Sequence, residues 1–155
     1  MVAKPYAVIH ESSAMPLIEQ SLTIALRAYA GKVDKAGREY IHHPLRVMAK
    51  MNTDLEMAVA LLHDVIEDSD ISAEQLLAEG MPVQVVDAIL CLTKGEGEDY
   101  LQFVARAKRN PIARKVKIAD IEDNINLLRL TSVSERDLER VRKYHAAWRF
   151  LNDES

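Results

Sequence analysis

The sequence predicts an all-α fold. Apolar residues recur every three or four positions along most of the 155 residues, which is the spacing that gives an α-helix one apolar face. Alternating strand patterns and the Asn-Gly or Asp-Gly pairs of β-hairpins are absent, and only five glycines and five prolines interrupt the periodic stretches. These observations predict one compact multi-helix domain over 1–155, with a core at about 20–130 and a C-terminal packing helix at about 134–152.

The helix boundaries follow from the periodicity and from residues that favour helix ends. The expected helices span about 14–31, 44–52, 54–67, 72–79, 82–93, 98–109, 110–129 and 134–152. Residues that favour a helix start stand near the beginning of five of them: Thr53 or Asp54, Ser72, Pro82, Pro111 and Ser134. The remaining segments rich in turn residues are Gly31–Pro44 and Lys94–Gly97, which we expect to be loops.

Composition narrows the setting of the protein. The 48% hydrophobic and 28% charged content is typical of a soluble globular chain, and no apolar run approaches the ~20 residues of a membrane span. Met1–His10 lacks the long apolar stretch of a secretory signal, and the single Cys91 cannot form an internal disulfide, so we expect a cytoplasmic location. A net charge of −4 gives no general attraction to nucleic acid. An anionic ligand must therefore be bound by a local positive site.

A histidine and three carboxylates interrupt the apolar run of the expected helix 54–67. On one continuous helix, the rotation about the helix axis can be counted from His63. Asp64, Glu67 and Asp68 then lie at about 100°, 40° and 140°, opposite the apolar face. Carboxylates held this close together raise one another's pKa. A divalent metal among them is the simplest way to relieve the repulsion.

Two other segments combine polar groups with apolar neighbours. Lys117, Asp120 and Asn124 share one helix face because they are three and four residues apart, although a surface aspartate with a lysine partner has the same pattern. Pro44 favours the first turn of a helix, so His43 lies where a loop enters a helix. His42 precedes it, and on this evidence either histidine could be the functional one.

Three motifs in this order resemble the HD superfamily of metal-dependent phosphohydrolases: Tyr40–Pro44, Leu61–Asp68 and Val116–Asn124. Within that superfamily the sequence is most similar to the Rel/Spo alarmone hydrolase domain and its small stand-alone relatives. Those enzymes remove the 3′-diphosphate from guanosine tetra- and pentaphosphate. The resemblance covers about residues 20–130 and implies a metal-dependent hydrolase with a small nucleotide as its substrate, without a nucleic-acid or membrane partner.

The resemblance also implies the site residues. Four residues match the family's metal ligands: His43, His63, Asp64 and Asp120. Two imidazoles and two carboxylates form a mixed nitrogen and oxygen site that suits Mn²⁺, with Fe²⁺, Zn²⁺ and Mg²⁺ as alternatives.

Four other residues match the catalytic and substrate-binding positions of the family or lie beside them. Glu67 and Asp68 match the catalytic acidic pair, which we expect to orient the attacking water and to move protons. Asn124 matches an asparagine near the substrate. Lys117, two helical turns earlier, is expected to steady the substrate phosphates.

One position departs from the family pattern. The loop before the first metal-binding histidine carries an adjacent Arg-Lys pair in the alarmone hydrolases, and here these residues are Asp34 and Lys35. Lys35 can still bind a phosphate or the base, but an aspartate cannot place a cation over a base. Guanosine tetraphosphate remains the favoured substrate. The alternatives are another nucleotide and, less favoured, a non-catalytic nucleotide-binding HD module.

The other charged and aromatic residues receive plainer interpretations. The alternating charges along 136–143 indicate a solvated helix face. Four other cations could offset the missing arginine, although a solvated surface charge is the simpler interpretation of each: Lys32, Arg38, Arg46 and Lys94. The apolar residues near the C-terminus either dock the last helix on the body or form a homodimer contact: Trp148, Phe150 and Leu151.

Overall fold

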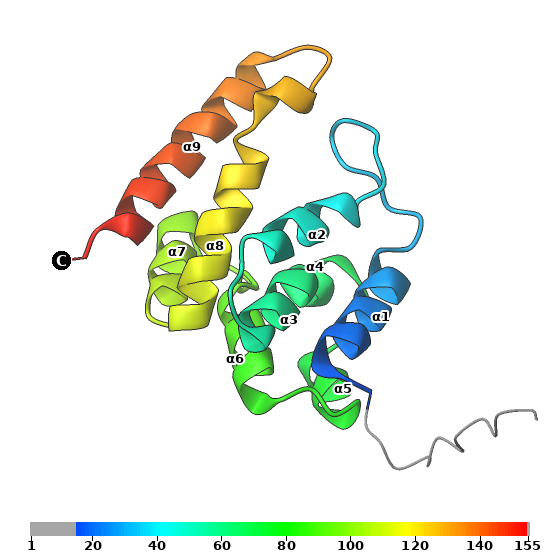
Figure 1. The fold of residues 1–155 in the computed structure, drawn as a ribbon. Helices are drawn as coiled ribbons and strands as arrows, with labels where there is room; N and C mark the ends of the chain where they lie inside the picture. The colour runs from blue at the N-terminus through cyan, green and yellow to red at the C-terminus, as the bar shows by residue number, and fades with distance from the viewer. Residues whose placement is uncertain (1–14, 155) are drawn as a thin grey trace, which may run out of the picture.

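The computed structural model describes residues 15–154 (Figure 1). Residues 1–14 and residue 155 lie outside the described part. They include Met1–His10, where the sequence predicts no secretory signal. The elements in chain order are α1 Leu17–Tyr29, α2 His42–Ala49, α3 Asp54–Leu62, α4 Val65–Asp68, α5 Ala73–Ala78, α6 Val83–Cys91, α7 Tyr100–Lys108, α8 Pro111–Asn124, the 3-10 helix η1 Leu127–Arg129 and α9 Glu135–Asn152.

The all-α prediction is confirmed. Across residues 15–154 the only β-type pairing is a single bridge between Val33 and Glu39, in the loop between α1 and α2. No helix in this range is both long and apolar enough to cross a membrane.

Side-chain caps explain where several helices begin. Thr53 accepts the amide of Glu56 while the Glu56 carboxylate accepts the Thr53 amide, and Ser72 forms the same reciprocal pair with Gln75. Asp99 caps α7 in this way as well, although the sequence prediction began that helix near residue 98. Each such cap stabilises a helix by ~1 kcal/mol.

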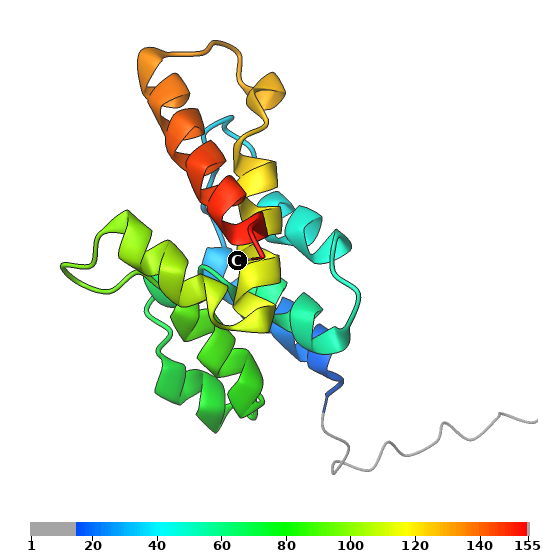
Figure 2. The same cartoon turned by 90° about the vertical axis from the view of Figure 1, so that its left-hand side faces the viewer.

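The main hydrophobic core is built around α3. All of Ala58–Leu62 is fully buried, and α3 packs against α1, α2, α6 and α8. A smaller cluster joins α9 to the body where Ala147 and Leu151 meet Val104 and Ile121, and α9 lies along α8 (Figures 1 and 2). The last helix therefore docks on the body through Leu151, and a homodimer contact stays a prediction.

The expected continuous helix 54–67 is wrong. The structure has two helices there, α3 and α4, separated by His63 and Asp64. Asp64 has φ −104° and ψ 3°, in the bridge region where active-site residues are often found. Its amide donates to the hydroxyl of Tyr29 at 3.2 Å. Because this partner comes from α1, 35 residues earlier, the break depends on a tertiary contact that helical periodicity does not contain.

Candidate metal centre

Three residues from distant parts of the chain meet in the interior. His43 from α2, His63 from the end of α3 and Asp120 from α8 are 5%, 2% and 5% exposed. The two Nε2 atoms are 3.3 Å apart, and Asp120 Oδ1 lies 2.9 Å from Nε2 of His43 and 3.5 Å from Nε2 of His63. The structure therefore brings together three of the four residues predicted as metal ligands within 4.8 Å of one another.

The hydrogen bond made by Nδ1 of each imidazole determines that Nε2 is the ring nitrogen with an available lone pair. His43 Nδ1 lies 2.6 Å from Asp123 Oδ2, and His63 Nδ1 lies 2.6 Å from the carbonyl oxygen of Ala60. A carboxylate and a carbonyl only accept hydrogen bonds, so each Nδ1 carries the proton. Both Nε2 lone pairs consequently face each other and the Asp120 carboxylate. A positive charge between them stabilises this arrangement, and the donor set fits a divalent metal.

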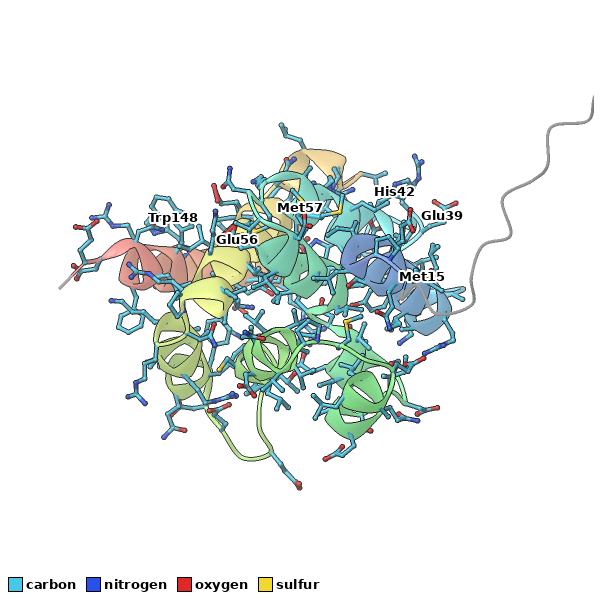
Figure 3. All side chains as sticks on the ribbon, turned by 60° about the horizontal axis from the view of Figure 1, so that its bottom comes forward. Met15, Glu39, His42, Glu56, Met57 and Trp148 are labelled. Atoms are coloured by element: carbon cyan, nitrogen blue, oxygen red, sulfur yellow. The ribbon has the colours of Figure 1, made fainter. Side chains whose placement is uncertain are left out.

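The pKa directions agree with an environment that attracts positive charge. Burial opposes the charged form of both histidines. Hydrogen bonds that His43 donates to Asp120 and Asp123 nevertheless raise the pKa of His43, and Asp64 and Asp120 raise the pKa of His63 well above its ordinary value. The neighbouring side chain of His42 is 44% exposed and pairs with Glu39 at the surface (Figure 3). Of the two adjacent histidines, only His43 points into this cluster.

Asp64, the fourth predicted ligand, lies beside this group toward the solvent. Its Oδ2 is 3.1 Å from Nε2 of His63, and its side chain is 21% exposed. The hydroxyl of Tyr40 donates to the same carboxylate. Burial and the Asp64 charge raise the pKa of Tyr40, so that the phenol stays protonated and remains a donor. Tyr40 is the first residue of the Tyr-Ile-His-His-Pro motif. Its position in this motif is the sequence signal that could have identified it as a site residue.

Lys117 and Asn124 hold Asp120 in place. Lys117 Nζ lies 2.8 Å from Oδ2 and Asn124 Nδ2 lies 2.8 Å from Oδ1. Burial disfavours the charged lysine, but Asp120 keeps the pKa of Lys117 above its ordinary value. The sequence predicts both residues as substrate contacts, whereas in the structure each donates to a predicted metal ligand.

Asp123 is a functional candidate that the sequence analysis missed. It is 7% exposed and accepts hydrogen bonds from Arg46 Nε at 2.7 Å and from His43. Burial would raise the pKa of Asp123, but the hydrogen bonds from His43 and Arg46 hold it well below its ordinary value. Arg129 also reaches this carboxylate, at 3.4 Å. The interpretation of Arg46 as a mere solvated surface charge is therefore wrong, because its guanidinium is bonded to a buried carboxylate.

The predicted acidic pair lies on α4 next to the cluster. Glu67 accepts the backbone amide of Lys94, and burial is the main reason that the pKa values of Glu67 and Asp68 are raised. The loop that carries Lys94 is held by Arg106, which donates to the carbonyl oxygens of Leu90 and Thr93, both at 2.7 Å.

A pocket of about 380 Å³ opens beside His43. Its walls carry Tyr144 and four cationic side chains, from Lys35, Arg46, Arg129 and Arg140. Asp34 lies in the same wall, but its Oδ1 accepts the amides of Ala36 and Arg38 at 2.8 and 2.9 Å. Asp34 thus orders the loop that presents Lys35.

Fold and site together define a helical domain with a buried His-Asp centre, as in the HD class. No family model matches the sequence. Relatives include a guanosine-3′,5′-bis(diphosphate) 3′-pyrophosphohydrolase of Vibrio cholerae, 34% identical over 125 residues, covering 72% of this chain and 18% of the relative. A GTP pyrophosphokinase of Streptomyces coelicolor is 29% identical over 131 residues, covering 77% of this chain and 16% of the relative.

A solved structure with the same fold is described as a metazoan ortholog of SpoT that hydrolyzes ppGpp. It aligns with a TM-score of 0.72 at 19% identity and covers 90% of this chain and 87% of its own. The comparisons support a Rel/Spo-type HD hydrolase domain, so the family predicted from the three motifs is confirmed. The chain spans less than a fifth of the length of the curated relatives described above.

Proposed function

We propose that this chain is a metal-dependent phosphohydrolase that removes the 3′-diphosphate from guanosine tetra- or pentaphosphate. The observation that carries the proposal is the meeting of His43, His63 and Asp120 at the edge of a pocket rich in cations. The 3′-pyrophosphohydrolase relative from Vibrio cholerae supports the choice of reaction. Water and the nucleotide would yield pyrophosphate and a nucleotide with a free 3′-hydroxyl.

Four residues would hold the metal: His43, His63, Asp64 and Asp120. Mn²⁺ suits this mixed nitrogen and oxygen set best, with Fe²⁺, Zn²⁺ and Mg²⁺ as alternatives. When bound, such an ion lowers the pKa of a coordinated water and polarises a phosphoryl oxygen.

The protein's own groups have separate tasks in this proposal. Glu67 accepts a proton from the attacking water, because its carboxylate is fixed by the Lys94 amide and its raised pKa makes it a better base than an exposed glutamate. Asp68 returns a proton to the leaving group. Lys117 and Asn124 keep Asp120 oriented. The pocket cations, Lys35 among them, neutralise the phosphates of the substrate.

One observation favours a different nucleotide as the substrate. The Asp34 carboxylate lies in the pocket wall where the family carries the arginine that contacts the base, so the base preference can differ from that of the relatives while hydrolysis at the metal is retained.

The test is turnover by metal-loaded protein with a panel of nucleotides. We expect pyrophosphate release from guanosine tetraphosphate, with little release from simple 5′-nucleotides. Monophosphate release from 5′-nucleotides alone would move the proposal to a nucleotidase. If metal is bound but no nucleotide is hydrolysed, the enzyme assignment fails and the chain is a binding module.

A further inference from the structure

Arg106, on α7, binds the loop that connects α6 to α7. Its guanidinium donates to the carbonyl oxygens of Leu90 and Thr93, both at 2.7 Å, and to the two Glu98 carboxylate oxygens at 2.8 and 3.0 Å. The Glu98 carboxylate also accepts the amide of Gly95 at 2.9 Å. The hydrogen bonds from Arg106 lower the pKa of Glu98 to about 2, so this ion pair stays charged. Arg106 therefore fixes a loop that projects from the body (Figure 2).

Lys94 connects this loop to the candidate active site. Its backbone amide donates to the Glu67 carboxylate on α4. The carbonyl oxygen of Thr93, which Arg106 binds, and the amide of Lys94 belong to the same peptide group. In a planar trans peptide the C=O and the N–H point in opposite directions. This one peptide group is therefore held on one side by the Arg106 guanidinium and on the other side by the Glu67 carboxylate.

The Lys94 amide is one of several groups that act on Glu67. Burial raises the pKa of Glu67, and the charges of Asp64 and Asp68 raise it further. The Lys94 amide and the charge of Lys117 lower it. A donor bonded to the charged form of a carboxylate stabilises that form. Loss of this amide would therefore raise the pKa of Glu67 and would also remove the hydrogen bond that orients its side chain.

We propose that Arg106 is a positioning residue of the candidate active site, which holds the Glu67 carboxylate in its working orientation through the Thr93–Lys94 peptide group. The positive charge at the carbonyl side polarises the peptide, so the N–H on the other side is a stronger donor. Arg106 is not part of the wall of the pocket beside His43, so it acts on the rate and not on substrate binding. This inference rests on the proposed function, which makes Glu67 the base.

The experiment compares Arg106→Gln with the unaltered protein in the hydrolysis of guanosine tetraphosphate at saturating Mn²⁺. We expect kcat to fall by about 10- to 100-fold, as expected for a displaced catalytic group, while KM and the Mn²⁺ affinity stay unchanged. The acid limb of the kcat profile should move to higher pH, because the amide bond that lowers the pKa of Glu67 is weakened. Arg109→Gln makes the same change at an exposed position just after α7 and should alter neither quantity.

A double variant separates positioning from general support of the fold. Glu67→Gln already lacks the carboxylate, so adding Arg106→Gln should cost little further rate, whereas the two losses would multiply if the residues acted independently. Multiplying losses, or an unchanged kcat and acid limb in Arg106→Gln, overturn the inference. If Arg106→Gln does not fold, Glu98→Gln serves in its place, because it removes the carboxylate that holds the guanidinium and the Gly95 amide.

Failure of the proposed function would give a different result. If the unaltered protein hydrolyses no nucleotide, the proposed function fails, and hydrogen exchange at the Lys94 amide tests the positioning of Glu67 separately. We expect this amide to exchange slowly in the unaltered protein and in Arg109→Gln, and faster in Arg106→Gln. Equal exchange rates in all three proteins refute the inference.

Discussion

Asp123 offers a direct test of how the candidate metal centre is organised. Its carboxylate accepts the Nδ1 proton of His43 at 2.6 Å and is 7% exposed. Asp123→Asn keeps the size and shape of the side chain but removes the charge that orients the imidazole and makes its Nε2 more basic. Loss of such a partner weakens metal binding by about 10- to 100-fold, which corresponds to about 1.4–2.8 kcal/mol.

The assay is calorimetric titration of Mn²⁺ into metal-free protein, with circular dichroism to verify that the variant is folded. Asp87→Asn is the matched control, because it makes the same change at an exposed position on α6. We expect the control to bind Mn²⁺ as the unaltered protein does. A folded Asp123→Asn variant with unchanged Mn²⁺ affinity would refute the assignment of Asp123 as the residue that positions His43.

Three further outcomes are expected. Asp64→Ala should lose Mn²⁺ binding and turnover together, whereas Glu67→Gln should retain Mn²⁺ and lose most of the rate; loss of the metal from Glu67→Gln would contradict this division of roles. Burial raises the pKa of Glu67, so activity at saturating Mn²⁺ should be present above that pKa and should disappear as the pH falls through it. The acid limb of the kcat/KM profile should therefore lie above the ordinary pKa of a glutamate, about 4.3. An acid limb at or below this value counts against Glu67 as the base. Leu61→Ala truncates a fully buried side chain, so in urea unfolding it should lower the free energy of unfolding by ~2–5 kcal/mol. Leu128→Ala changes a residue that is 94% exposed and should alter this free energy by less than ~0.5 kcal/mol. Similar losses for both variants would contradict the assigned core.

The sequence predicted those parts of the fold that depend on local interactions. Thr53 and Ser72 form the caps expected of them, because each bonds to an amide three residues later. The break after Leu62 was missed because it depends on the Tyr29 hydroxyl from another helix.

The difference between local interactions and contacts between distant helices also applies to the candidate site. The motifs indicated His63 and Asp120 directly, while the choice between His42 and His43 required the resemblance to a known family. Asp123 was not identified, because its role is defined by its bonds to His43 and Arg46 on α2, 80 and 77 residues away along the chain. Contacts between distant helices, unlike the periodicity within one helix, leave no regular pattern in a single sequence.

The central claim is that residues from three separate segments bind one cation. The most direct measurement is anomalous diffraction at the manganese edge from crystals of the protein grown with Mn²⁺. We expect one strong peak within bonding distance of Nε2 of His43, Nε2 of His63 and the carboxylates of Asp64 and Asp120. A peak elsewhere, or none at this position despite saturating Mn²⁺, would contradict it.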